Sequence, residues 1–228
     1  MSRSVKPRRA YESPRRRAQA DATRGAVLAA ARDLFVERGY VATTVRAIAD
    51  RAGVSPETVY ATFGNKRSLL SSVLDVSIVG DDEMVPLLER PWVKEMRDEP
   101  DPRRRLRILA RNGTMILERI APIHGVLHAA AATDPKVASL WERYASQRFA
   151  GQREIVRIVG AGGSLRKQLT TAEAADILFA IGSPETYRLL TVDRGWSPGR
   201  FERWYAATLT QLLLDRDEQA GRDRGSRA

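Results

Sequence analysis

Apolar residues recur along most of this chain at intervals of three and four positions, which is the spacing of one face of a helix. The segments with this spacing cover residues 21–38, 66–79, 103–119, 123–132, 135–159, 171–190 and 198–214. No segment alternates apolar and polar residues in the way of a half-buried strand. We therefore expect an all-α protein of about nine or ten helices.

The breaks between these segments are marked by proline, glycine and charge. Residues 80–102 combine a glycine, an acidic cluster and several prolines, which predicts irregular chain with short helical turns. Pro122 separates two of the predicted helices, and Ser183–Pro184 predicts a bend within residues 171–190. The glycine-rich residues 160–164 look like a dinucleotide loop, but they follow a helix and lack the last glycine of that motif, so we interpret them as a helix stop.

Residues 43–63 predict two short helices joined by a tight turn. Thr43 or Thr44 can cap the first helix, Gly53 suits the left-handed backbone of a turn, and Ser55, followed by a proline, can cap the second helix. One face of the second helix is apolar and points inward. The opposite face carries short polar and aromatic side chains, namely Glu57, Thr58, Tyr60, Ala61 and Thr62. Such a face suits a helix that enters the major groove of DNA, so the pattern indicates a helix-turn-helix.

The stretch from Thr23 to Leu70 resembles the DNA-binding domain of the TetR family of transcriptional regulators. The residues that carry the resemblance stand in the family's order and are Phe35, Gly39–Tyr40, Ile48–Ala49, Ala52–Ser55, Tyr60, Phe63 and Asn65–Lys66. A helix-turn-helix pattern alone would be weak evidence, and the alternative is a helical hairpin in an ordinary bundle. The resemblance implies a three-helix DNA-binding domain at residues 21–66 and a helical ligand-binding and dimerisation domain at residues 67–214.

The placement of charge agrees with this division. Of a net charge of +10, residues 1–70 carry +8, from 14 Lys and Arg against 6 Asp and Glu, while residues 71–228 carry +2, from 24 against 22. The helix-turn-helix segment is therefore the part expected to bind a polyanion, and DNA is the polyanion that the motif fits.

The two chain ends differ from the helical segments in composition. Residues 1–17 hold seven basic residues against one acid and are interrupted by prolines, so residues 1–20 are expected to form a flexible basic arm. This arm either contacts phosphates and the minor groove or is a solvated terminus. Residues 215–228, rich in Arg, Asp and Gly, are expected to be a frayed tail.

The resemblance also implies which residues touch DNA. Thr58, Tyr60 and Lys66 are expected to hold phosphates, and Thr44 contacts DNA beside them. Arg46 is the better candidate for a base reader, because a guanidinium can bind guanine O6 and N7 together. The full predicted surface is Thr44, Arg46, Ser55, Glu57, Thr58, Tyr60, Ala61, Thr62, Asn65 and Lys66.

Residues 103–187 contain adaptable and aromatic side chains with isolated polar groups among them, a mixture typical of ligand pockets. With the resemblance, they predict a site for a small-molecule effector. Its expected residues are Asn112, Met115, His128, Trp141, Tyr144, Arg148, Phe179 and Tyr187. The alternative is that these side chains simply fill the core.

We also expect a homodimer on a palindromic operator, because one helix-turn-helix covers too few base pairs for selective binding. The segments 171–190 and 198–214 would pair with their copies as a four-helix bundle, although part of their apolar stripe packs inside the monomer. The expected interface residues are Leu178, Ile181, Trp204, Leu209 and Leu213.

Other classes of protein are disfavoured by what the sequence lacks. Without cysteine there is no disulfide or thiolate site, and His124 and His128, four positions apart, lack a third and fourth metal ligand nearby. We find no nucleophile elbow, phosphate loop or carboxylate pair, so we expect neither an enzyme nor a cofactor. No segment has the length of a signal or a membrane span, so we expect a cytoplasmic protein.

The sequence therefore favours a DNA-binding transcriptional regulator, and the resemblance implies a repressor that a small-molecule effector releases from its operator. Two alternatives stay open. One is a helical enzyme that carries a DNA-binding module, and the other is an architectural DNA binder without a ligand.

Overall fold

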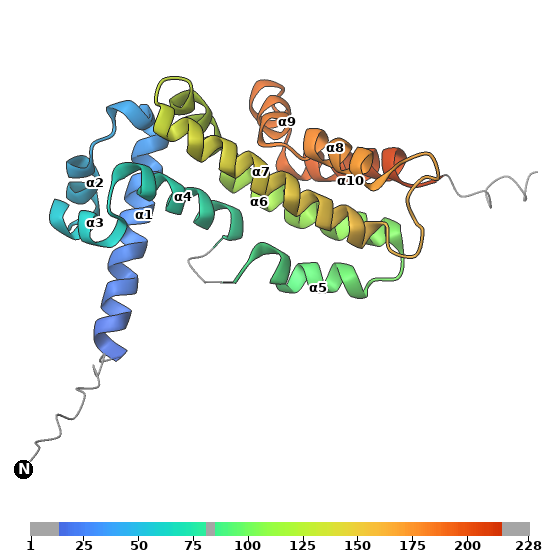
Figure 1. Cartoon of the computed structure of the whole chain (residues 1–228), viewed down its shortest axis with the longest axis horizontal. Coiled ribbons are helices and arrows are strands. Elements are labelled where there is room, and N and C mark those ends of the chain that lie inside the picture. The colour runs from blue at the N-terminus through green and yellow to red at the C-terminus, as the bar shows by residue number, and fades with distance from the viewer. Residues whose placement is uncertain (1–13, 81–84, 216–228) are drawn as a thin grey trace, which may run out of the picture. The chain divides into compact units, whose positions relative to one another are not determined.

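The computed structural model describes residues 14–80 and 85–215, and these are almost entirely helical (Figure 1). The helices are α1 (Pro14–Ala42), α2 (Val45–Ala52), α3 (Pro56–Phe63), α4 (Lys66–Val79), α5 (Pro91–Asp98), α6 (Pro102–Ala131), α7 (Pro135–Val159), α8 (Thr171–Ile181), α9 (Pro184–Arg188) and α10 (Pro198–Leu213). A 3₁₀ turn, η1 (Leu87–Glu89), precedes α5, and a π-helical turn, η2 (Leu189–Asp193), follows α9. No strand occurs among the described residues, where an isolated antiparallel bridge joins Leu165 and Leu214. The all-α prediction is confirmed.

The chain divides into two compact units, Met1–Val73 and Leu74–Ala228, and the division falls inside α4. The sequence placed this boundary at residue 66. In the N-terminal unit, α2 packs against both α1 and α3. The core is made by side chains that are almost completely buried, namely Val27, Ala31, Leu34, Phe35, Ile48, Ala49, Val59, Leu69 and Leu70. Packing against this core stabilises α2 and α3, because an isolated helix of eight residues is not stable in water.

Helix α1 is longer than the sequence pattern predicted. It begins at Pro14 rather than at residue 21, so Arg15, Arg16 and Arg17 are exposed residues of its first turns. Proline is compatible with this position because the first helical N–H groups have no acceptor inside the helix. The expectation of irregular chain up to residue 17 is thus wrong for these arginines, while residues 1–13 of the expected arm lie outside the described part.

The C-terminal unit is built around four helices. Helix α6 packs against α7 and α10, and α8 packs against the same two helices, while α5 and α9 cover α6. Buried apolar side chains from all of these helices meet in one core, which includes Leu106, Val156, Ala175, Leu178, Phe201, Leu209 and Leu213. The expected tail begins beyond this core, and residues 216–228 are not described.

Three predicted breaks differ in the structure. Helix α6 runs without interruption through Pro122, which is exposed, while its neighbours Ala121 and Ile123 are buried against other helices. Proline removes one backbone hydrogen bond from a helix, and packing on both sides of this point keeps the helix continuous. Residues 91–98, where irregular chain with short helical turns was expected, form the eight-residue helix α5. The expected bend at Ser183–Pro184 is a full break between α8 and α9.

Candidate nucleic-acid interface and inner polar cluster

The ends of α2 and α3 are held by caps that the sequence encodes locally. The Thr44 hydroxyl accepts a hydrogen bond from the Ala47 N–H at 3.1 Å, and the Ser55 hydroxyl accepts one from the Thr58 N–H at 3.2 Å. Between the helices, Gly53 has φ 69°, a left-handed conformation in which a side chain would be strained. The predicted helix-turn-helix is therefore present. The capping residue is Thr44, because the buried Thr43 hydroxyl instead donates to the Leu34 and Gly39 carbonyls of α1.

The side chains expected to contact DNA lie mostly at the surface. Eight of them are exposed, namely Thr44, Arg46, Ser55, Glu57, Tyr60, Ala61, Thr62 and Asn65, and Thr58 and Lys66 are half-buried. Tyr60 is 52% exposed, which is unusual for an aromatic ring on a polar surface and favours a binding role. Their contact with DNA stays a prediction.

Hydrogen bonds within the unit distinguish these side chains further. The Ser55 and Thr58 hydroxyls lie 3.2 Å apart, and the Thr62 hydroxyl donates to the Thr58 carbonyl at 2.8 Å. Among the described residues, neither Arg46 nor the Tyr60 hydroxyl has a hydrogen-bond partner. These two are the side chains whose hydrogen-bonding capacity is fully open to a ligand.

Lys66 has surroundings that the sequence did not suggest. Its Nζ donates to the Tyr40 carbonyl at 2.8 Å and to the Thr43 carbonyl at 2.9 Å, and it lies 4.3 Å from the centre of the Tyr40 ring. Two of its three N–H bonds thus tie the start of α4 to the segment between α1 and α2. Asn65 also serves the fold, since its Oδ1 accepts a hydrogen bond from the Ser68 N–H at 2.9 Å and caps α4.

Only part of the predicted effector site comes together in the C-terminal unit. The His128 and Trp141 rings lie 4.9 Å apart, and Tyr144 lies 6.2 Å from Trp141, all between α6 and α7. Along α7, the Arg148 guanidinium carbon lies 3.9 Å from the centre of the Phe179 ring. These five predicted residues therefore follow one side of α7.

Of the other three predicted residues, two make contacts that serve the fold and one is exposed. Tyr187 packs edge-on against Phe201 in the core, with ring centres 4.9 Å apart. The Asn112 amide donates to the Ile108 carbonyl of its own helix at 2.9 Å, and Met115 is largely exposed. A sequence pattern cannot separate these from the first group, because all eight occupy similar positions on amphipathic helices.

The structure adds polar residues that the sequence did not assign to this site. His124 is 4% exposed, and its ring lies 5.0 Å from Trp141 and 5.5 Å from Tyr144. Its Nε2 has no hydrogen-bond partner and lies 3.6 Å from a carboxylate oxygen of Glu185. The spacing of four between His124 and His128, which places both on one face of α6, was the available signal in the sequence.

Burial controls the protonation of these groups. It lowers the pKa of His124 to about 4, against the opposing influence of the Glu185 carboxylate, so the imidazole is neutral at pH 7. Burial also raises the pKa of Tyr144 to about 12, raises the pKa of Tyr205 and lowers the pKa of Arg148. The Arg148 charge influences the pKa of each of the other three. We call His124, Tyr144, Arg148 and Tyr205 the inner polar cluster.

No group of three or more His, Asp or Glu side chains is placed to hold a metal ion in the parts of the chain that the structure describes. His124 and His128 instead each lie against the Trp141 indole.

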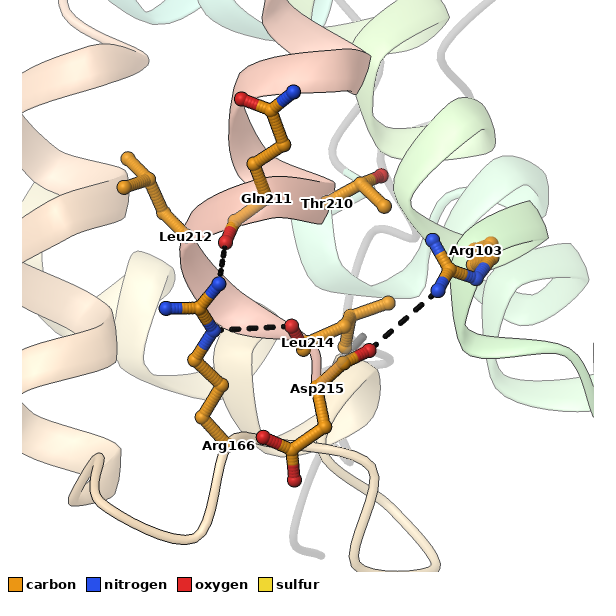
Figure 2. Close-up of a pocket in the computed structure, with 7 residues that line it drawn as sticks. All are labelled: Arg103, Arg166, Thr210, Gln211, Leu212, Leu214 and Asp215. Carbon is orange, nitrogen blue, oxygen red and sulfur yellow. Dashed lines mark hydrogen bonds between the residues drawn. The ribbon is translucent and has the colours of Figure 1, made fainter. Parts of the chain in front are cut away.

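A surface hollow of about 340 Å³ lies at the end of α10 and contains none of the predicted site residues (Figure 2). Arg166 donates to the Gln211 and Leu214 carbonyls, and Arg103 donates to the Asp215 carbonyl at 3.5 Å. Both guanidinium groups are thus used to hold the end of α10, where helix carbonyls lack partners. We assign the hollow a structural role.

Three of the residues expected at a dimer interface are buried inside the monomer. Leu178, Leu209 and Leu213 belong to the core of the C-terminal unit and are 2% exposed or less. They are not available to a second copy, which corrects this part of the prediction, because α10 packs against both α6 and α8 and the three side chains lie in the shared core. Ile181 and Trp204 are half-buried and remain available at the surface.

Comparisons with known proteins bear on both units. Residues 27–73 match the family model described as bacterial regulatory proteins, tetR family. YdeS of Bacillus subtilis, an uncharacterized HTH-type transcriptional regulator, is 29% identical over 78% of this chain and 84% of its own. TtgR of Pseudomonas putida, an HTH-type transcriptional regulator, is 27% identical over 88% of this chain and 96% of its own.

Solved structures share the fold at low sequence identity. NalD, the secondary repressor of the MexAB-OprM multidrug efflux pump in Pseudomonas aeruginosa, has a TM-score of 0.64 and 21% identity, and covers 88% of this chain and 99% of its own. A putative transcriptional regulator from Saccharomonospora viridis, solved in complex with choline, has the same TM-score and identity over 85% and 98%. None of the described helices combines the length and apolar character that crossing a membrane requires.

Proposed function

By its N-terminal domain this chain belongs to the tetR family of bacterial regulatory proteins, and we propose that it is a repressor that a small molecule releases from its operator. That it is a DNA-binding transcriptional regulator follows from the family match and from relatives that align over most of the chain. Repression, release and the sites that perform them are the proposal. The observation that carries it is a polar reading face on α3 combined with a buried polar cluster in the other unit.

On DNA, Arg46 and Tyr60 are the proposed principal contacts. Arg46 lies on α2 and Tyr60 on α3, and both side chains are exposed with their hydrogen-bonding groups unused within the described chain. Thr44 caps the helix of Arg46, Thr58 and Thr62 lie on α3 with Tyr60, and their hydroxyls can hold phosphates in the register that the two helices set. Lys66, whose Nζ already donates to two carbonyls, can add its charge and the positive end of α4.

The proposed effector site is the side of α7 that carries Trp141, Tyr144 and Arg148. Its support is chemical: aromatic walls, neutral hydroxyl and imidazole groups, and one guanidinium. A structural neighbour of the same fold has been solved with choline and another is a repressor, which makes a ligand-responsive repressor a reasonable function for this fold. A ligand acts on DNA affinity only if it binds one conformation better than another.

The experiment that tests the proposal has two stages. Duplexes bound by the full-length protein would be selected from a random pool, and the preferred sequence would be titrated by fluorescence anisotropy. Compounds that raise the melting temperature would then be added to the preformed complex. We expect a palindromic site and at least one stabilising compound that weakens operator affinity tenfold or more, equivalent to about 1.4 kcal/mol of coupling. Stabilising compounds that all leave operator affinity unchanged would refute release by ligand.

A further inference from the structure

Arg148 is a partly buried cation without a carboxylate partner. Its guanidinium lies over the Phe179 ring and donates one hydrogen bond to the Phe179 carbonyl of α8. None of the ion pairs among the described residues includes it. A guanidinium has five N–H donors, and a cation withdrawn from water is costly unless its charge and donors are satisfied. The Glu185 carboxylate acts on this charge only from beyond ion-pair distance, so the guanidinium can still pair directly with one negative charge.

The polar groups around Arg148 are neutral hydrogen-bonding groups. Burial keeps the Tyr144 hydroxyl protonated and His124 uncharged. The Tyr205 hydroxyl also reaches this region, since it would lie only 2.2 Å from a Cβ added to Gly182, directly after α8. A carboxylate bound to Arg148 could accept hydrogen bonds from the tyrosine hydroxyls. The His124 Nε2, which has no hydrogen-bond partner, is one more group that could hydrogen-bond to the ligand.

The remaining walls are aromatic. Trp141 lies beside His124 and Tyr144, and Phe179 lies under the guanidinium with Phe149 edge-on against it at 5.7 Å. Aromatic faces of this kind pack well against a flat ring of a ligand. A carboxylate at the edge of that ring could then pair with the Arg148 guanidinium.

The competing charge is that of Glu185. Its side chain is 59% exposed, and it lies at the outer edge of the cluster, 3.6 Å from His124. At His124 the Glu185 carboxylate influences the pKa more than Arg148 does, whereas at Tyr144 the Arg148 charge has the larger influence. Because solvent screens the exposed carboxylate, the side of the cluster around Arg148 and Tyr144 favours a negative charge. A cationic ligand bound here would lie close to the Arg148 guanidinium and would be repelled by it.

We infer that the effector of this site is an aromatic carboxylate, with its carboxylate paired to Arg148 and its ring against Trp141 and Phe179. The inference rests on the proposed effector site and specifies its chemistry. It predicts selectivity by charge among molecules of nearly equal shape.

The test uses the full-length protein and three probes, 2-naphthoate, 2-naphthamide and 2-naphthyltrimethylammonium, in isothermal titration calorimetry at neutral pH. We expect the carboxylate to bind at least tenfold more tightly than the amide and the ammonium compound to bind least. In Arg148→Gln this preference should disappear, while Arg153→Gln, which removes an exposed arginine of the same helix, should keep it. The relative affinities of the three probes for the wild-type protein test the inference even if Arg148→Gln fails to fold.

Equal binding of the acid and the amide, a preference for the ammonium compound, or a preference that survives in folded Arg148→Gln would overturn the inference. So would a lack of binding by a wider panel of aryl carboxylates at millimolar concentration. Operator titrations in parallel separate this result from the proposed function. If the carboxylate binds without releasing DNA, the proposed release by effector is refuted but the chemistry of the site is not. If only a neutral or cationic compound releases DNA, the inferred carboxylate chemistry is refuted but release by effector is not.

Discussion

At the scale of single residues, two cations beside the reading face have opposite surroundings. The Arg46 side chain is exposed and makes no hydrogen bond within the described chain, while the Lys66 side chain donates to two backbone carbonyls. The first can exchange water for DNA at little cost to the fold. The second cannot leave its position without exposing two acceptors that it satisfies.

Replacing Arg46 with alanine should lower affinity for the selected operator and relax preference at one base pair, by about 1–3 kcal/mol, because a bidentate contact to guanine is lost. Anisotropy titrations against the operator and single-base variants would measure both effects. Arg153→Ala, which removes an equal charge from α7, is the control and should change neither. An operator profile identical to that of the wild type would remove Arg46 from the reading surface.

Lys66→Met should destabilise the N-terminal unit by about 1–3 kcal/mol, because two carbonyls lose their donor and the Tyr40 ring loses a cation. Urea unfolding followed by circular dichroism would measure the loss, and Lys167→Met at an exposed loop position is the matched control. Unchanged stability together with weaker DNA binding would show instead that Lys66 acts as a phosphate contact.

His124 predicts a pH dependence of stability in the C-terminal unit. Its pKa is lowered to about 4 in the folded protein, so the unfolded chain binds its proton more readily between about pH 6.5 and 4. The contribution of His124 is therefore complete above pH 6.5 and is lost as the pH falls toward 4. The decrease in unfolding free energy over this range should be smaller in His124→Phe than in His128→Phe. Equal slopes would contradict the assignment.

At the scale of helices, α4 is the element shared by both units, and each of its ends is held by a cation. Lys66 holds its start, while Arg119 of α6 donates to the Ser77 and Ile78 carbonyls at 3.1 and 3.2 Å near its end. The helix stops at Gly80, with φ 93°, and a Cβ there would lie 3.1 Å from the Arg119 guanidinium carbon. Arg119 thus links the end of α4 to the helix that carries His124 and His128.

Arg119→Gln should weaken the transmission between effector and operator, because α4 loses its hydrogen bonds to α6. We expect effector affinity and operator affinity, measured separately, to change less than threefold, while the loss of operator affinity on adding effector falls from tenfold or more to about twofold. Arg111→Gln, which breaks an exposed ion pair between α6 and α5, is the control. Full release in Arg119→Gln would exclude this route.

At the scale of the whole molecule, the proposed regulator needs two reading heads, and so a dimer. The available surface on α10 is the stripe of Trp204, Thr208 and Leu212, which lie four positions apart and are half-buried or exposed. Ile181 at the end of α8 is also half-buried. This stripe replaces the buried leucines as the candidate interface.

Leu212→Glu should shift the protein toward monomers and reduce operator affinity, because a charge in an apolar interface is costly to bury. Analytical ultracentrifugation across micromolar concentrations would show the shift. Val85→Glu is a matched control, since Val85 and Leu212 are both 37% exposed. A wild-type protein that sediments as a monomer would contradict the dimer itself.

Much of the fold could be read from local signals. Thr44, one of the two threonines predicted as a cap, and Ser55 cap α2 and α3, and Asp134 and Ser197 cap the helices predicted to start directly after them. Gly53 and Gly160 follow the last residues of α2 and α7, where the sequence predicted a turn and a helix stop. These signals work because a cap is formed by residues within one turn of each other. The helix-turn-helix and its exposed face were predictable for the same reason.

Contacts between residues far apart in the sequence could not be predicted from local signals. Whether Leu209 faces a second copy or the core depends on α6 and α8, and whether Pro122 breaks a helix depends on what covers its neighbours. The two bonds of Lys66 and the meeting of His124 with Tyr144 join elements whose relative position is absent from any local pattern. The sequence by itself determined where the helices begin and which faces are apolar. The tertiary structure decided which apolar faces are covered and which polar groups are brought together, because packing selects among partners that periodicity leaves equivalent.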